Sequence, residues 1–434
     1  MASVSNVFIF GLDDFHRAQL ATIDQAQRFN FEPLLAHDEA IHPEVFPVDE
    51  MLAKSQRTLE HYPKSVDAVC TYWDFPTSTL VPILRERFGL AGANLSAVLK
   101  LEHKYWARHE QQAVVPELIL DFCAVDPFAD DPAESLSIDY PLWLKPIKAH
   151  SSYLGFRIHN DREWRHAIEQ TRRGIEQFAK PFNEILAFAD LPDAIAPIGG
   201  YHCIAESIIS AGQQCTLEGY AYRGEVVVYG VVDSVRGGRH RSSFQRYQYP
   251  STLPRRVQSR MIDAARRVIR HAGYTDAPFN MEFFWHPSRD TLSLLEVNAR
   301  CSKSHSPLFH LVDGASHLQV MVNLGVGREP NMPARRGEFA LAAKFMLREF
   351  KPGVVRRVPS ADDIDRLYAR FPEAQLHVHV EAGQDLNALR FQDSYSFGLA
   401  DLFLGANDQR QLLQKYAEAQ AILGFEVAYQ APAA

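Results

Sequence analysis

The sequence lacks the features that define several large classes of protein. It has no apolar run long enough to span a bilayer, and it has neither an internal repeat nor a low-complexity tract. Its 45 Lys and Arg residues are outnumbered by 53 Asp and Glu residues, so the basic surface that broad nucleic-acid binding requires is missing. We therefore expect a globular protein of two to four domains that binds neither membranes nor nucleic acid.

Cysteine is also scarce, and its distribution indicates the compartment. The five cysteines are odd in number, scattered and without metal-type spacing, which is typical of reduced thiols in a cytoplasmic protein. No apolar signal segment precedes the first predicted strand. We therefore expect a cytoplasmic location, and we expect Cys301 to serve in packing.

The first 95 residues predict a parallel α/β domain. Buried-strand patterns alternate there with helical patterns, over residues 7–11, 18–29, 66–72 and 77–88. The turn after the first strand lacks the GxGxxG pattern, so no dinucleotide site is expected. Asp74 follows the second strand, at the kind of loop that meets ligands in such sheets, and is a candidate substrate contact. Capping of the next helix is the simpler alternative for Asp74.

The region from residue 96 to about 330 mixes helices with strands. A helix is expected from Ser96 onward and to include Lys104, and further helices are expected over 163–178 and 255–271. Strands are expected over residues 118–120, 140–146, 204–212, 215–222 and 225–233. The basic stretch 237–249 is expected to be a mobile loop.

Lys145 and the loop that follows it are a first candidate for a phosphate site. Lys145 lies near the end of a predicted strand, and residues 147–156 are rich in small side chains before they become apolar again. A loop of this kind can lay backbone N–H groups along phosphate oxygens, and a lysine adds a point charge. A solvated strand end is the alternative interpretation of Lys145.

The sequence centres on a predicted hairpin that carries two glutamates. Residues 279–283 and 292–300 are rich in β-formers and are separated by turn residues. Pairing around this turn places Glu282 close to Glu296, with Asn298 on the same face as Glu296. Opposed carboxylates repel unless a cation lies between them, and with an amide oxygen they form the hard oxygen set that holds Mg²⁺. The hairpin therefore predicts a magnesium–nucleotide site, and a solvated acidic face is the alternative.

After residue 330 the pattern changes to an α+β tail. Strands are expected over 339–348, 376–380 and 394–399, with helices from Ala361 and over 408–423. His377 and His379 share a strand face, which could suit a metal. The sequence offers no third metal ligand beside them, so a structural role for the two histidines, at the surface or in the core, is favoured.

Taken in order, these residues resemble the ATP-grasp superfamily. The set consists of Lys104, Lys145, the small-residue loop, Glu206, and Glu282 followed by Glu296-x-Asn298-x-Arg300. The resemblance implies an α/β and α+β protein with the ATP-grasp fold. It would have an N-terminal parallel α/β domain (1–95), a two-subdomain ATP-binding core (96–330, as about 96–205 and 206–330) and a small C-terminal α+β domain (331–434).

The resemblance also implies how ATP and its metal are held. Lys104 and Lys145 would contact the phosphates of ATP, and the loop with Ser151, Ser152 and Gly155 would cover them. A hinge that starts at Glu206 and includes Ile208 and Ile209 would bind the adenine through its backbone groups. Glu282, Glu296 and Asn298 would hold Mg²⁺, expected as two ions, with Mn²⁺ as a substitute. The chain departs from the family in having Gln213-Gln214 where an acidic residue usually binds the ribose, so Gln214 is the candidate contact there.

Within the superfamily, the chain looks like the carboxylate–amine ligases of the L-amino-acid ligase and carnosine-synthase type in its length, in the tail that begins with residues 339–343, and in the segment 248–251. Such enzymes form an amide bond through an acyl phosphate and release ADP and phosphate. The implied catalytic residues are Arg300 and Lys145. Candidate contacts for a small-molecule carboxylate and amine are Lys303, His305 and Asp74. A homodimer is left open.

Two other functions are also left open. A biotin-carboxylase-like enzyme, in which Arg300 also has a counterpart, would use bicarbonate and need a biotinylated partner. A nucleotide-binding regulatory protein without turnover is favoured by Gln213-Gln214 and by the glycine-poor loop. Retention of opposed carboxylates, which are costly without a metal, argues against that alternative.

Overall fold

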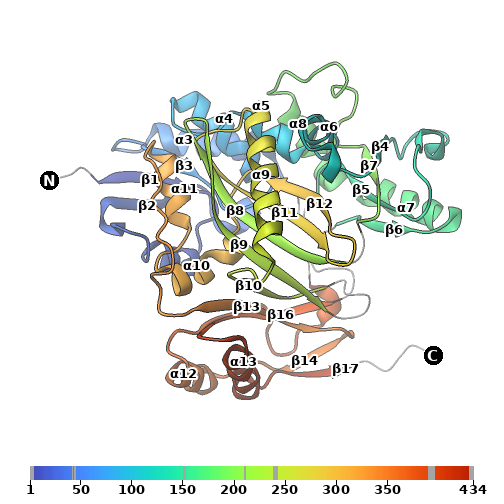
Figure 1. Cartoon of the computed structure of the whole chain (residues 1–434). Coiled ribbons are helices and arrows are strands. Elements are labelled where there is room, and N and C mark those ends of the chain that lie inside the picture. The colour runs from blue at the N-terminus through green and yellow to red at the C-terminus, as the bar shows by residue number, and fades with distance from the viewer. Residues whose placement is uncertain are drawn as a thin grey trace. The chain divides into compact units, whose positions relative to one another are not determined.

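The computed structural model describes residues 4–41, 43, 45–149, 153–209, 212–237, 243–389 and 396–429 (Figure 1). The chain forms two compact units, and each is built from separate stretches of sequence. The first unit comprises Met1–Tyr229, Pro254–Lys303 and Leu318–Asn331, and the second comprises Gly230–Leu253, Ser304–His317 and Met332–Ala434. In the described part of the chain, no helix has the length and apolar character needed to cross a membrane.

The first unit begins with the predicted parallel sheet. Its strands β1 (Ser5–Ile9), β2 (Phe29–Pro33) and β3 (Ala68–Cys70) pair in the order β2-β1-β3, and every pairing is parallel. The accompanying helices are α1 (Asp14–Leu20), α2 (His37–Ile41), α3 (Val48–Glu60) and α4 (Thr77–Phe88). The α/β prediction for this region is therefore confirmed, and the predicted bounds of α4 are correct.

One predicted helix of this region, over residues 18–29, is wrong. The side chain of Asp13 accepts a hydrogen bond from the backbone N–H of His16, which caps α1 and starts it at Asp14. The helix ends at Leu20, and Phe29 begins β2 instead of ending a helix. The apolar positions that suggested a longer helix are thus divided between two elements.

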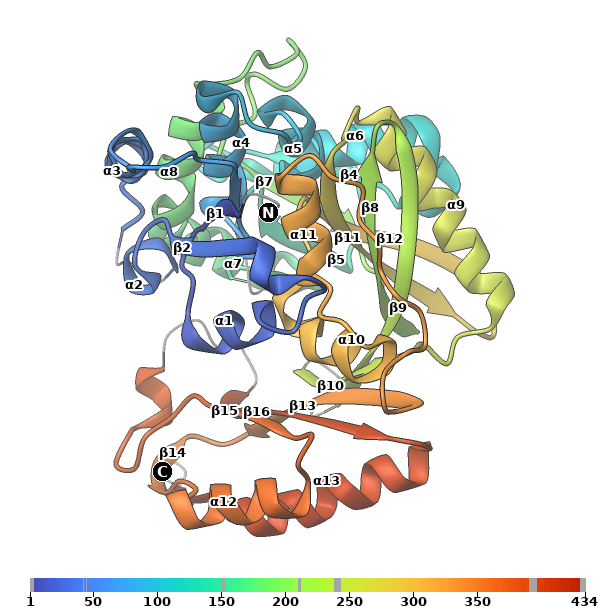
Figure 2. The ribbon, with the colours of Figure 1, turned by 90° about the vertical axis from the view of Figure 1, so that its left-hand side faces the viewer.

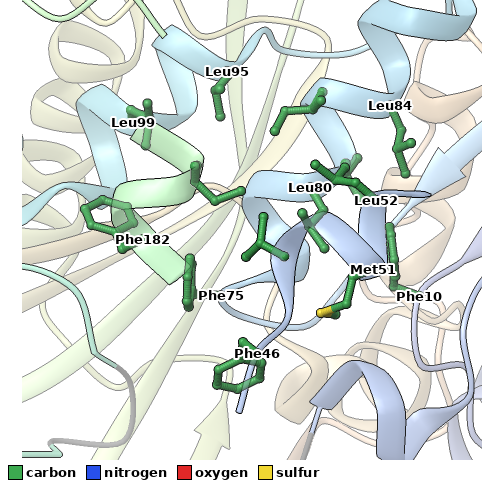
Figure 3. Packing of buried hydrophobic residues seen from close by; sticks show 14 of the residues in the cluster. Phe10, Phe46, Met51, Leu52, Phe75, Leu80, Leu84, Leu95, Leu99 and Phe182 are labelled. Carbon is green, nitrogen blue, oxygen red and sulfur yellow. The ribbon is translucent and has the colours of Figure 1, made fainter. Parts of the chain in front are cut away.

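A hydrophobic core fixes the loop after β3 (Figure 3). Phe75, directly after Asp74, is buried and lies with its ring centroid 5.8 Å from that of Phe182 on α8 (Glu176–Leu186). Leu80 of α4 and Leu99 belong to the same core. This packing gives Asp74 a fixed backbone position.

Phe182→Ala is expected to reduce the free energy of unfolding by about 3–5 kcal/mol, because Phe182 is fully buried and its removal leaves a cavity. Phe188, which is 43% exposed near the end of the same helix, is a matched control whose substitution by Ala should cost about 1 kcal/mol or less. Urea unfolding followed by circular dichroism measures both. Equal losses for the two variants would contradict this assignment of the core.

The next part of the first unit is a four-stranded antiparallel sheet with helices. The sheet has the order β4-β7-β5-β6, from β4 (Phe122–Val125), β5 (Leu142–Pro146), β6 (Phe156–Ile158) and β7 (Cys203–Ser207). The remaining helices are α5 (Leu95–Glu102), α6 (Lys104–Val114) and α7 (Asp161–Gly174). The sheet carries Lys145 on β5 and Glu206 on β7.

Two predictions for this part need correction. The strand expected over 118–120 is wrong, because Pro116 begins a 3-10 turn over Pro116–Leu118 and the strand, β4, follows at Phe122. The helix expected from Ser96 through Lys104 is two helices, since the ring of His103 accepts from the backbone N–H of Trp106 and starts a new helix, α6. Lys104 consequently lies in the first turn of α6.

The first unit is completed by the predicted hairpin and its neighbours. Strands β12 (Thr291–Asn298), β11 (Ala277–His286) and β8 (Gln213–Tyr222) pair antiparallel in that order. The arginine-rich helix α9 spans Arg255–His271, as predicted, and α11 (Leu318–Gly325) contacts both β3 and β11. The hairpin prediction is confirmed.

The second unit is an antiparallel sheet with a pair of helices along it. Strand β9 (Glu225–Gly237) enters this unit at Gly230, and the order continues as β9-β10-β13-β16-β15, with β10 (Ser243–Tyr249), β13 (Leu341–Glu349), β15 (Gln375–Val378) and β16 (Phe397–Ala406). Strands β14 (Gly353–Arg357) and β17 (Glu426–Tyr429) pair separately. Figure 2 shows α12 (Ala361–Arg370) and α13 (Gln409–Leu423) side by side along the sheet, and α10 (Ser306–Asp313) contacts β13 and β16.

Two predictions concern this unit. The expected mobile loop over 237–249 is wrong for residues 243–249, which form β10 between β9 and β13, while residues 238–242 lie outside the described part. Among the described residues, His377 and His379 are not part of any group of three or more side chains that could hold a metal. The His379 ring nitrogen lies 3.2 Å from Asp401, which in turn binds Lys344 at 2.8 Å. These contacts place His379 in a polar network with Asp401 and Lys344 on the sheet.

Candidate functional site

The two glutamates lie opposite each other on the β11–β12 hairpin. Glu282 pairs directly with Glu296, and Asn280 pairs with Asn298. Because alternate residues of a strand share a face, these four side chains form two adjacent rows on one face of the sheet. Glu218 of β8 extends the second row, since it pairs with Asn280. The register predicted from the turn is thus confirmed, and the polar face is wider than the sequence suggested.

Amide side chains form hydrogen bonds on this face of the sheet. Gln214 Nε2 donates to Glu282 Oε2 at 2.7 Å. Asn298 Nδ2 donates to Asn280 Oδ1 at 2.9 Å, and Asn280 Nδ2 donates to the backbone carbonyl of Arg300 at 3.1 Å. Gln214, which the family resemblance suggested for the ribose, is therefore engaged with a proposed metal carboxylate.

The donor set has the chemistry of a hard-cation site. Glu282, Glu296 and Asn298 are half-buried and supply carboxylate and amide oxygens. Among the described residues, no group of three or more His, Cys, Asp or Glu side chains is placed to hold a metal. Two carboxylates and amide oxygens cannot complete six-fold coordination alone, so these residues fit a Mg²⁺ ion that draws further oxygens from phosphates and water.

Two lysines of the first unit are the candidate phosphate contacts. Lys145 Nζ lies 2.6 Å from Glu206 Oε2, and Lys104 Nζ donates to the carbonyl of Ala149 at 3.1 Å. Burial lowers the pKa of Lys104 to about 8; the charges of Lys148 and Lys145 act in the same direction, and Glu296 opposes them. A cation of this kind is stabilised by any anion that enters its surroundings.

Glu206 is held by two cations. Burial alone would raise the pKa of this carboxyl, but the charges of Arg108 and Lys145 outweigh burial and lower it to about 2. Its side chain is therefore an ionised structural partner of both cations. Any contact of this stretch with a base would come from backbone groups at Ile208 and Ile209, which follow β7 and are half-buried.

Arg300 is held by the loop after β3. Its Nε lies 2.9 Å from Asp74 Oδ1 and its Nη2 lies 2.7 Å from Asp74 Oδ2, a bidentate pair. Burial by itself would lower the pKa of the guanidinium, but the Asp74 carboxylate outweighs burial and raises it. Asp74, a candidate substrate contact in the sequence, thus serves to orient Arg300.

The remaining candidates lie in several places. The Lys303 ammonium lies 3.4 Å from the centre of the Trp73 ring, next to the Asp74–Arg300 pair. His305 is buried in the second unit, with its ring edge-on to Tyr247 at 5.0 Å.

Gly155 directly precedes β6, whereas Ser151 and Ser152 lie outside the described residues. Cys301 is fully buried among apolar side chains, so its predicted packing role is confirmed.

Sequence reasoning missed Arg108 and Asn280. Arg108 lies four residues after Lys104 on α6, so the two share a helix face, and this spacing was an available signal. Asn280 precedes Glu282 by two residues on one strand face, which was also readable from the sequence. The contacts that these residues make with distant parts of the chain could not be predicted from the sequence.

Comparisons with known proteins agree on one architecture. Residues 138–306 match the family model of the ATP-grasp domain, and no curated protein gives a sequence match. The L-amino acid ligase from Bacillus licheniformis superposes with a TM-score of 0.71 at 14% identity, over 99% of this chain and 100% of that one. Biotin carboxylase from Campylobacter jejuni, in an ATP complex, gives 0.63 at 13% identity, over 98% and 93%. Phosphoribosylglycinamide synthetase from Anaerococcus prevotii gives 0.61 at 11%, over 99% and 100%.

Proposed function

Since this chain has the ATP-grasp fold, which confirms the resemblance predicted from its sequence, we propose that it is an ATP-dependent ligase that joins a carboxylate to an amine. A carboxylate oxygen would attack the γ-phosphorus of ATP, giving an acyl phosphate and ADP. The amine would then displace phosphate and form an amide. The observation that carries this proposal is the set of Glu282, Glu296 and Asn298 on one face of the paired strands β11 and β12, with Arg300 two residues after Asn298.

The metal would be held by Glu282, Glu296 and Asn298. When bound there with ATP, Mg²⁺ supplies charge neutralisation for the β- and γ-phosphates, which is most of what phosphoryl transfer requires. Gln214 would keep Glu282 oriented for that role, because its side-chain amide donates a hydrogen bond to one oxygen of the Glu282 carboxylate. Mn²⁺ accepts the same oxygen ligands.

The cationic side chains would bind and orient the phosphates. Lys145 and Lys104 supply ammonium groups, and Arg300 supplies a planar fork that Asp74 keeps in one orientation. Arg300 would stabilise the charge that develops on the transferring phosphoryl group and on the acyl phosphate. Exclusion of water from this site would protect the acyl phosphate from hydrolysis.

The test is nucleotide release from purified protein with Mg-ATP and pools of amino acids and other carboxylates, with and without amines. ADP and phosphate that appear only with a carboxylate–amine pair would support the proposal and identify the substrates. Turnover with bicarbonate and biotin would favour the second candidate, which rests on the likeness to biotin carboxylase. Tight ATP binding without turnover in any pool would favour a regulatory protein.

The affinity for ATP is expected to fall above pH 8. The pKa of Lys104 is lowered to about 8 in the free protein, so the ammonium that attracts phosphate is present below that pH and is lost above it. The KM for ATP should therefore be level below pH 8 and rise about tenfold per pH unit above it. Steady-state kinetics across pH 6.5 to 9.5 measure this, with Lys104→Met as the control whose KM should be high and level. A level wild-type profile would contradict the role of Lys104.

A further inference from the structure

Arg108 makes three hydrogen bonds from inside the first unit. It is 5% exposed, on α6, one turn after Lys104. Its Nε donates to Glu206 Oε1 at 2.5 Å, its Nη1 donates to Gln111 Oε1 at 2.6 Å, and its Nη2 donates to the backbone carbonyl of Leu295 at 2.5 Å. Every nitrogen of the guanidinium is thus engaged, each with a different residue.

These bonds join the two halves of the nucleotide site. The second oxygen of the same Glu206 carboxylate accepts from Lys145, so Arg108 and Lys145 share one buried anion. Leu295 directly precedes Glu296 on β12. A continuous series of contacts therefore runs from the phosphate-side lysine, through Glu206 and Arg108, to the backbone beside a metal carboxylate.

The charges in this series explain why a second cation is needed. An ionised carboxylate inside a protein is strongly destabilised unless a cation is paired with it. If Lys145 were the sole partner of Glu206, any movement of its ammonium toward a phosphate would leave that carboxylate uncompensated. With Arg108 in place, Glu206 keeps one paired cation throughout. The free-energy cost of moving the Lys145 ammonium to a phosphate is therefore lower.

We propose that Arg108 is a positioning residue for the nucleotide: it neutralises Glu206, which leaves Lys145 available to the phosphates, and it fixes the β12 backbone next to Glu296. This inference rests on the proposed function, because it assumes that the site binds Mg-ATP. A guanidinium is suited to both tasks, since its fork reaches the carboxylate and the carbonyl at once.

The test separates the two tasks by measuring the binding of the ATP analogue AMP-PNP with Mg²⁺ by calorimetry. Arg108→Met should weaken binding by about tenfold or more, because Lys145 is then needed by Glu206. Adding Glu206→Gln to that variant removes the buried anion and should restore affinity to within about threefold of wild type. Arg108→Lys keeps a cation beside Glu206 but loses the fork, so it should bind the analogue nearly as wild type does and turn over ATP more slowly.

The control is Arg267→Met, which removes an exposed arginine that pairs with Glu117 and should leave binding unchanged. Weak binding by the Arg108→Met/Glu206→Gln variant would show a merely structural role and overturn the inference. If the Arg108→Met protein does not fold, the single variant Glu206→Gln tests the inference instead. This variant should bind AMP-PNP at least as tightly as the wild-type protein does. Weaker binding would overturn the inference. Failure of the wild-type protein to bind AMP-PNP would contradict the proposed function itself.

Discussion

Glu296→Ala is expected to abolish ATP turnover. Glu296 lies directly opposite Glu282, and the two supply the only carboxylates of the proposed metal set. Loss of one leaves a single carboxylate and amide oxygens, which is too weak a ligand set to hold a metal on the phosphates. Because such a metal contributes several kcal/mol of charge stabilisation, kcat should fall by about 10³-fold or more.

The matched control is Glu60→Ala, which removes an exposed glutamate on α3 and should leave kcat unchanged. Binding of Mn²⁺ in the presence of ADP, followed by electron paramagnetic resonance, separates loss of the metal from loss of the fold. A Glu296→Ala protein that retains wild-type turnover would refute the metal assignment.

Arg300→Met is expected to give the second-largest loss. Arg300 is half-buried, is held by Asp74 through two hydrogen bonds, and lies two residues beyond Asn298. Removal of one positioned cation from a phosphoryl-transfer site should lower kcat by about 10²–10³-fold. Binding of Mg-ATP should change much less, because the metal set and both lysines remain.

The matched control for this variant is another arginine–aspartate pair. Arg256 lies 2.7 Å from Asp290, but both side chains are largely exposed. Arg256→Met should therefore leave kcat and stability close to wild type. Equal kinetic behaviour of Arg300→Met and Arg256→Met would exclude a catalytic role for Arg300.

Elements with strong local signals could be predicted from the sequence. The β11–β12 hairpin has period-two alternation on both sides of a turn, and this fixed the register of Glu282 against Glu296. Helix α9 has a continuous apolar stripe, and both its ends were predicted. Errors arose where a cap or a proline decided the boundary, as Asp13 does for α1 and Pro116 does before β4.

The contacts that organise the site depend on residues far apart in the sequence. Asp74 and Arg300 are 226 residues apart, and Arg108 and Leu295 are 187 residues apart. No periodicity or motif specifies such pairs, since they follow from how α6 and the loop after β3 pack against the rest of the first unit. The sequence therefore indicated the chemical groups of the site, whereas the partners that orient them required the fold.

The most direct test of the proposed reaction follows an oxygen atom. A pool of amino acids labelled with ¹⁸O in their carboxylates is incubated with the protein and Mg-ATP, and the phosphate and nucleotide products are examined by mass spectrometry. An acyl phosphate transfers one carboxylate oxygen to the phosphorus. The proposed reaction therefore predicts that ADP is the nucleotide product and that each inorganic phosphate released carries one ¹⁸O atom. Label in AMP, or unlabelled phosphate alongside amide product, would contradict it.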